Sequence, residues 1–158
     1  MTERGMDACE DDGSRCRPRH HFQVDIENDF AHVKPVRDLL SSLCRLEGFD
    51  DETIEEIRLV ATELINNAIE HSGTRATEIR GRVFADAFEL SVLDRGAETL
   101  DDGIFEFDAP PSHLGDRGRG LFLIKAFTDE ARVTQPEGGG TCITIVKRKP
   151  APGDNDEA

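Results

Sequence analysis

The stretch ETIEEIRLVATELINNAIEHSG, residues 52–73, carries the strongest structural signal in the chain. Its apolar residues recur every three or four positions, which is the spacing of one face of an α-helix. Acidic residues at positions 50–52 suit the positive end of the helix dipole, and Ser72-Gly73 ends the pattern. The sequence therefore predicts a helix from about Glu52 to Glu70, with a buried stripe made of Ile54, Ile57, Ala61, Leu64, Ile65 and Ala68.

The segments on either side of this helix predict an α/β fold. Residues 21–26 alternate as a strand, and a helix capped by Asn28 or Asp29 follows and ends at Gly48. Downstream, strand-like runs occur at 77–84, 88–93, 131–134 and 141–146, with a short apolar helix at 121–127 between the two pairs. This order predicts a two-layer sandwich in which about three helices cover one face of a mixed sheet.

The chain is long enough, at 158 residues, for one domain with its own core. Residues 1–19 are polar and aperiodic, and residues 150–158 combine Pro, Gly and acidic side chains. Both ends are therefore expected to be disordered. The folded domain is expected to span residues 20–149.

The composition excludes several kinds of partner. A net charge of −14 disfavours direct binding to nucleic acid or to an anionic membrane surface, and the absence of Trp and Tyr removes the usual platforms for base stacking. A nucleotide remains compatible, because backbone N–H groups and a metal ion can bind phosphate on an acidic protein. The chain lacks a long apolar run, a signal-peptide pattern and metal-type Cys spacing, so we expect a protein of the reducing cytoplasm.

Glu63 and Asn67 form the first candidate site. They are four residues apart, so both side chains leave the same flank of the predicted helix, and His71 continues that flank. Asn67 lies at the edge of the apolar stripe, where an amide without a partner would be costly. Its carbonyl oxygen suits Mg²⁺, and Glu63 could activate a nucleophile that attacks a phosphate. The alternative is a solvated helix face that carries Glu and Asn by chance.

Three glycine-containing motifs follow along the chain. Asp94-Arg95-Gly96 comes directly after an apolar strand, where the carboxylate could accept a hydrogen bond from the amino group of a planar ligand, or could simply end the strand. Residues 115–120, GDRGRG, precede a helix, so their N–H groups could converge on an anion, although a flexible turn would also fit. Arg117 and Arg119 add positive charge there. Gly138-Gly139-Gly140-Thr141 could be a hairpin turn or could present the Thr hydroxyl to phosphate.

The order and spacing of these motifs resemble those of the GHKL ATPases. Glu63-x-x-x-Asn67 resembles the N box of that superfamily, and Asp94-Arg95-Gly96 resembles its G1 box. Gly118-Arg119-Gly120-Leu121 is similar to the G2 box, and Gly140-Thr141 to the G3 element. Within the superfamily, the phrases ATELINNAIEHS and GRGLFLIKAFTDE are most similar to bacterial anti-sigma-factor serine kinases of the RsbW type. The resemblance covers residues 20–147.

This resemblance implies a Bergerat-type ATP-binding fold and a role for each matching residue. Asn67 would coordinate Mg²⁺, and Glu63 would be the general base for a substrate serine. Asp94 would hydrogen-bond the adenine amino group, with Gly96 making room for the base. The remaining contacts to ATP would come from Arg117, Gly118, Arg119, Gly120, Leu121 and Thr141. The loop from Gly96 to Arg117 would be the ATP lid.

The resemblance also implies partners. A sigma factor would be held inactive, and an anti-anti-sigma (STAS-type) protein would be phosphorylated on serine. Members of the family commonly form homodimers, so a homodimer is possible here. Two alternatives stay open. The chain could be a non-catalytic switch that uses ATP only to shape a partner-binding surface, or a detached catalytic domain of a sensor histidine kinase.

Overall fold

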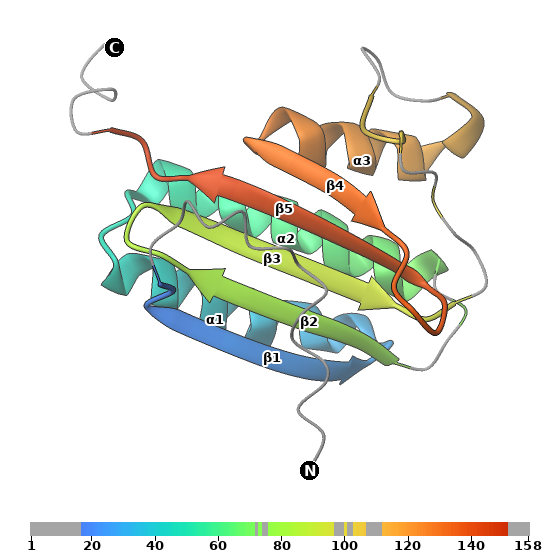
Figure 1. Cartoon of the computed structure of the whole chain (residues 1–158), viewed down its shortest axis with the longest axis horizontal. Helices are drawn as coiled ribbons and strands as arrows, with labels where there is room; N and C mark the ends of the chain where they lie inside the picture. Colours follow the sequence, from blue (N-terminus) through green and yellow to red (C-terminus); the bar gives the residue numbers. More distant parts are fainter. Residues whose placement is uncertain are drawn as a thin grey trace.

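The computed structural model describes residues 17–71, 73, 76–96, 100, 103–106 and 112–151 (Figure 1). Most of the predicted N-terminal extension and acidic tail, residues 1–16 and 152–158, lies outside the described residues. The same holds for much of the expected lid, at 97–99, 101–102 and 107–111. The described elements run from His20 to Arg148, within the predicted domain.

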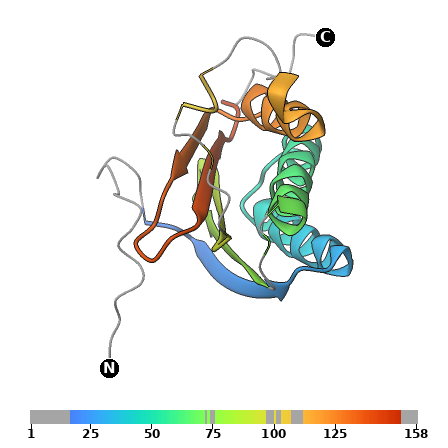
Figure 2. The ribbon, with the colours of Figure 1, turned by 90° about the vertical axis from the view of Figure 1, so that its right-hand side faces the viewer.

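Helices and strands occur in the predicted order. The helices are α1 (Val33–Leu46), α2 (Asp51–His71) and α3 (Asp116–Ala126), with short 3-10 turns at Phe30–His32 and Ser112–Leu114. The strands are β1 (His20–Glu27), β2 (Ala76–Val83), β3 (Ala87–Asp94), β4 (Glu130–Thr134) and β5 (Thr141–Arg148). Figure 2 shows all three helices on one face of the sheet, which confirms the predicted two-layer sandwich.

The sheet has the order β1-β2-β3-β5-β4, and every pair of neighbouring strands in it is antiparallel. The prediction of a mixed sheet was therefore wrong. Two helices connect β1 to β2, so the chain reverses its direction three times and returns antiparallel. β4 runs in the direction of β3, but β5 lies between them and removes the parallel pair.

The core lies between the sheet and the helices. All six residues of the predicted stripe on α2 are buried, which confirms its inward face. On β3, Phe88, Leu90 and Val92 alternate toward the helices and belong to the same apolar cluster. Asp94 continues this alternation at the end of the strand, so its side chain is on the helical side of the sheet.

The start of β1 and the end of β5 meet at the loop after α1. Nε2 of His20 lies 2.9 Å from Oε1 of Glu47. Nζ of Lys149 donates a 2.9 Å hydrogen bond to the carbonyl oxygen of Glu47. Glu47 thus links the start of β1 and the residue after β5 to the loop that follows α1.

Helix α3 begins earlier than the sequence predicts. It starts at Asp116 and not near Leu121, so Gly118 and Gly120 lie inside its first two turns. Gly115 precedes it with φ of 57°, a conformation that favours glycine. Packing of α3 against α2 offsets the low helix propensity of the two internal glycines. Among the described helices, none is both long and apolar enough to cross a membrane.

Candidate functional site

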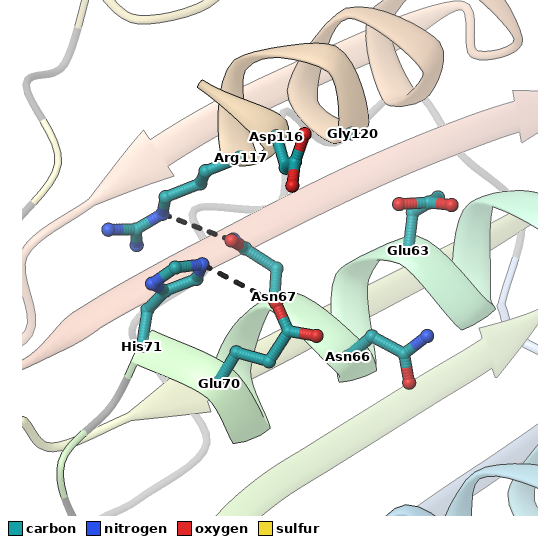
Figure 3. A pocket seen from close by; sticks show the side chains of 8 residues that line it. All are labelled: Glu63, Asn66, Asn67, Glu70, His71, Asp116, Arg117 and Gly120. Atoms are coloured by element: carbon teal, nitrogen blue, oxygen red, sulfur yellow. Dashed lines mark hydrogen bonds and ion pairs between the residues drawn. The ribbon is translucent and has the colours of Figure 1, made fainter. Parts of the chain in front are cut away.

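The C-terminal half of α2 and the first turns of α3 face each other at one end of the molecule. Figure 3 shows Glu63, Asn67 and His71 along one flank of α2, as their spacing predicts, with Arg117 of α3 above them. The end of β3 lies at this same end of the molecule in Figure 1. The fold therefore gathers three of the predicted motifs at one end.

A pocket with a volume of about 180 Å³ lies between the two helices. This is smaller than the roughly 300–1,000 Å³ typical of pockets that hold a whole drug-sized ligand. Its size suits a part of a nucleotide, such as its phosphates. It is lined by Glu63, Asn66, Asn67, Glu70, His71, Asp116, Arg117 and Gly120.

Asn67 and Arg117 are directly bonded across this pocket. Nε of Arg117 donates to Oδ1 of Asn67 at 3.0 Å, and both side chains are half-buried. The bond links the end of α2 to the first turn of α3 (Figure 3). The oxygen predicted to hold a cation is therefore already in contact with a cationic group.

Glu63 lies against the backbone of Gly120. A Cβ atom added to Gly120 would stand 2.9 Å from Oε2 of Glu63. The Glu63 carboxylate thus fills space that any other residue at position 120 would need.

Negative charge dominates the pocket lining. Glu63, Glu70 and Asp116 contribute three carboxylates against the one guanidinium of Arg117, a formal charge of −2 with His71 neutral. Asp116 also forms an ion pair with Arg119, and Nε2 of His71 lies 3.6 Å from Oε2 of Glu70. A polyphosphate would be repelled by this lining unless a cation accompanied it.

Asp94 occupies a second part of the site at the end of β3. It is only 6% exposed, and its Oδ1 accepts a 3.1 Å hydrogen bond from the N–H of Gly96. In the sheet register it stands between Thr77 and Thr141, both of which are buried. Gly140 packs so closely that a Cβ there would lie 2.0 Å from the carbonyl oxygen of Asp94, and its φ is 99°.

The structure brings some of the predicted site residues together and separates others. Glu63, Asn67, Arg117 and Gly120 line the pocket, whereas Asp94, Gly96 and Thr141 lie at strand ends and are not part of its lining.

The other predicted residues of α3 have surroundings of their own. Leu121 is fully buried in the core, and Arg119 is exposed beside Asp116. Gly118 is buried, and its N–H donates to the carbonyl oxygen of Gly115 at 3.1 Å. That N–H group is thus bonded within the helix in this conformation.

Sequence reasoning missed three residues of the lining: Asn66, Glu70 and Asp116. Asn66 and Glu70 lie three and seven positions after Glu63, and this spacing could have indicated the same helix flank. Asp116 could not be found in this way, because its place depends on where α3 begins.

Comparison with known proteins identifies the family of this chain. The sequence model of a family described as Histidine kinase-like ATPase domain matches residues 26–147. A serine-protein kinase RsbW from Oceanobacillus iheyensis is 29% identical over 118 residues, covering 68% of this chain and 74% of the relative. Proteins of the same name from Bacillus subtilis and Staphylococcus epidermidis are 29% and 27% identical, covering 78% and 80% of this chain and 84% and 86% of theirs.

A solved structure shares the fold. The crystal structure of the RsbU and RsbW domains of a Mycobacterium tuberculosis protein superimposes with a TM-score of 0.61 at 21% identity. The match covers 85% of this chain but only 34% of that longer one.

Proposed function

The chain belongs to the family of histidine kinase-like ATPase domains, and we propose that it is an ATP-dependent protein serine kinase that also acts as an anti-sigma factor. In this proposal it transfers the terminal phosphoryl group of ATP to a serine of an anti-anti-sigma (STAS-type) protein, which yields ADP and phosphoserine. It would also sequester a sigma factor in the cytoplasm. The similarity to proteins named serine-protein kinase RsbW supports this choice within the family.

The pairing of Glu63 with Asn67 carries the proposal. The two side chains lie one helical turn apart on the flank of α2 that faces the start of α3, and both line the same pocket. A carboxylate and an amide oxygen so arranged can serve a proton transfer and a cation at neighbouring points. A solvated helix face would leave neither group against a second helix.

The residues present fit Mg²⁺ and a polyphosphate. Oδ1 of Asn67 is a hard oxygen ligand directed into the pocket, where its present partner is a cationic group. The excess of carboxylates in the lining favours a divalent cation beside any phosphate. A Mg²⁺ ion held there with ATP would supply charge neutralisation for the phosphates.

Other steps of binding and catalysis would be carried out by separate residues of the chain. Glu63 would accept the proton of the substrate serine, while Asn67 would hold the metal ion. Arg117 would offer its guanidinium to a phosphate once it leaves Asn67. The buried Asp94 would accept a hydrogen bond from the adenine amino group, with Gly96 beside it. Supporting contacts to ATP are assigned to Arg119 and Gly120 at the start of α3. Gly118, Leu121 and Thr141 are buried, so they would contact ATP only after a local rearrangement.

The decisive experiment measures ATP binding and phosphoserine formation together. The purified protein is incubated with Mg²⁺, ATP and a STAS-type protein of the same organism, and the product is mapped by mass spectrometry. We expect phosphoserine with the wild type. Glu63→Gln should bind ATP within about threefold of the wild type but lose roughly 10²–10⁴-fold in transfer rate, the usual contribution of a general base.

Glu55→Gln provides the matched control, because Glu55 is an exposed glutamate on the same helix outside the pocket. Its transfer rate should equal that of the wild type. ATP binding without any transfer would favour a non-catalytic switch, and phosphohistidine on a partner would favour a detached sensor-kinase domain. Lack of ATP binding would contradict the nucleotide site itself.

A further inference from the structure

Gly120 stands where its backbone does not require glycine. It lies in the second turn of α3, and it is absent from the glycines with positive φ in the described residues. A helix-interior glycine of ordinary conformation is less favourable than alanine. Something other than backbone geometry must therefore account for glycine at this position.

The surroundings of Gly120 supply that reason. A Cβ added there would lie 2.9 Å from Oε2 of Glu63 and 4.0 Å from its Cδ. Among the described residues, and apart from its chain neighbours and the backbone of α3 itself, it would meet no other heavy atom within 4 Å. A carbon and an oxygen that are not bonded prefer a separation of about 3.5 Å. In the described part of the chain, the Glu63 carboxylate is thus the group that would have to move to admit a side chain at position 120.

We propose that Gly120 is a positioning residue, which keeps open the space that the Glu63 carboxylate occupies. A methyl group at position 120 would displace this carboxylate from its place between α2 and α3. The catalytic role of Gly120 rests on the proposed function, because Glu63 is the general base only in that proposal. The spatial relation between Gly120 and Glu63 does not depend on it.

The displacement would be local. The clashing atoms are at the end of a flexible side chain, so the carboxylate can rotate away while the helices keep their places. Gly140 differs, because a Cβ there would meet the backbone of Asp94 and Arg95. Gly120→Ala also keeps the backbone N–H of residue 120. Any phosphate contact through that N–H would survive the substitution.

A thermal unfolding cycle of the ligand-free protein tests the spatial relation without reference to activity. The four proteins are the wild type, Gly120→Ala, Glu63→Ala and the double variant. In the Glu63→Ala background, Gly120→Ala should raise Tm by about 2–4 °C, because alanine is the better helix former and nothing obstructs it. In the wild-type background this gain should be lost. An equal gain in both backgrounds would overturn the proposal.

A second measurement separates the position of Glu63 from ATP binding. Gly120→Ala should bind ATP with Mg²⁺ within about threefold of the wild type, while kcat for phosphoserine formation falls at least tenfold at unchanged KM. Loss of ATP binding in Gly120→Ala would overturn the proposal, because the space beside Gly120 would then be occupied by the ligand. A kcat equal to that of the wild type would overturn it as well. If the wild type itself transfers no phosphate, the proposed function fails, and the unfolding cycle still decides the role of Gly120.

Discussion

Asn67 holds a position that two cations would compete for. In the described structure its Oδ1 accepts a hydrogen bond from Arg117, and in the proposed complex the same oxygen binds Mg²⁺. A guanidinium kept at hydrogen-bond distance would repel a divalent ion placed on the same oxygen. If Asn67 holds Mg²⁺ as proposed, Arg117 would have to leave this oxygen, and its guanidinium would then be available to a phosphate.

Removal of the Asn67 side chain should uncouple ATP binding from Mg²⁺. Asn67→Ala deletes the proposed metal ligand, so we expect ATP affinity in the presence of Mg²⁺ to fall by tenfold or more, about 1.4 kcal/mol. Calorimetric titration with and without Mg²⁺ measures this. Asn66→Ala is the matched control, because in Figure 3 its side chain points away from Arg117, and its effect should be clearly smaller. Equal Mg²⁺ dependence in Asn67→Ala and the wild type would contradict the metal assignment.

The bond between Arg117 and Asn67 should be detectable as a coupling in the ligand-free protein. Arg117→Ala and Asn67→Ala should be non-additive by about 1 kcal/mol, the usual net contribution of a half-buried hydrogen bond. Urea unfolding of the two single variants, the double variant and the wild type gives this value. Additive losses would mean that the bond contributes nothing to stability.

Some of these contacts could be predicted from the sequence and others could not, for a physical reason. Glu63 and Asn67 could be paired in advance, because a helix fixes the relation of positions four apart. The contact of Arg117 with Asn67 joins residues 50 positions apart and depends on how two helices pack. The same holds for Glu63 and Gly120, where the decisive feature is a missing side chain.

Helix α3 shows how packing overrides local preference. Residues 116–120 contain two glycines, and the pattern of apolar residues begins only at Leu121. The sequence therefore predicts a later start than the structure has. Packing against α2 is a tertiary effect that no local pattern contains.

The first turns of α3 should consequently be its least stable part. The backbone N–H groups of Arg119 and Gly120 should exchange with solvent faster than those of Ile124 and Lys125, because glycine weakens the helix at its start. Hydrogen exchange followed by mass spectrometry or NMR measures this, with the buried middle of α2 as the protected reference. Saturation with ATP and Mg²⁺ should slow exchange at the start of α3. Uniform protection along α3 would contradict this expectation.

The relative direction of neighbouring strands could not be predicted from the sequence. The order of helices and strands could be read from alternating patterns, and it is confirmed. That order does not specify which edge of the sheet a returning strand joins. Insertion of β5 between β3 and β4 makes every pair antiparallel, and this choice depends on long-range pairing.

The stability of the whole domain should fall in alkaline solution because of one buried thiol. Burial raises the pKa of the Cys44 thiol from 9.0 to about 12. The unfolded chain releases this proton near pH 9, whereas the folded domain retains it until about pH 12. The contribution of Cys44 is therefore fully present below pH 9 and is lost between pH 9 and 12, by up to about 1.4 kcal/mol per pH unit.

Urea unfolding between pH 7 and 11 provides the measurement. Cys44→Ala should lower stability at neutral pH through the lost volume, but its decline above pH 9 should be less steep than that of the wild type, so the difference between the two proteins should shrink. Identical slopes would show that other groups account for the alkaline loss.

The double contact of Glu47 has a consequence for protein engineering. Because His20 and Lys149 both reach this residue, the first and last strands of the domain converge at one corner. β1 and β5 are separated there by only β2 and β3, a gap of roughly 14 Å at the usual strand spacing. A short flexible linker could span it, and new termini could be opened at the exposed turn of Ala85 and Asp86. The domain is thus suited to circular permutation, with the join at the corner and the order of the sheet unchanged.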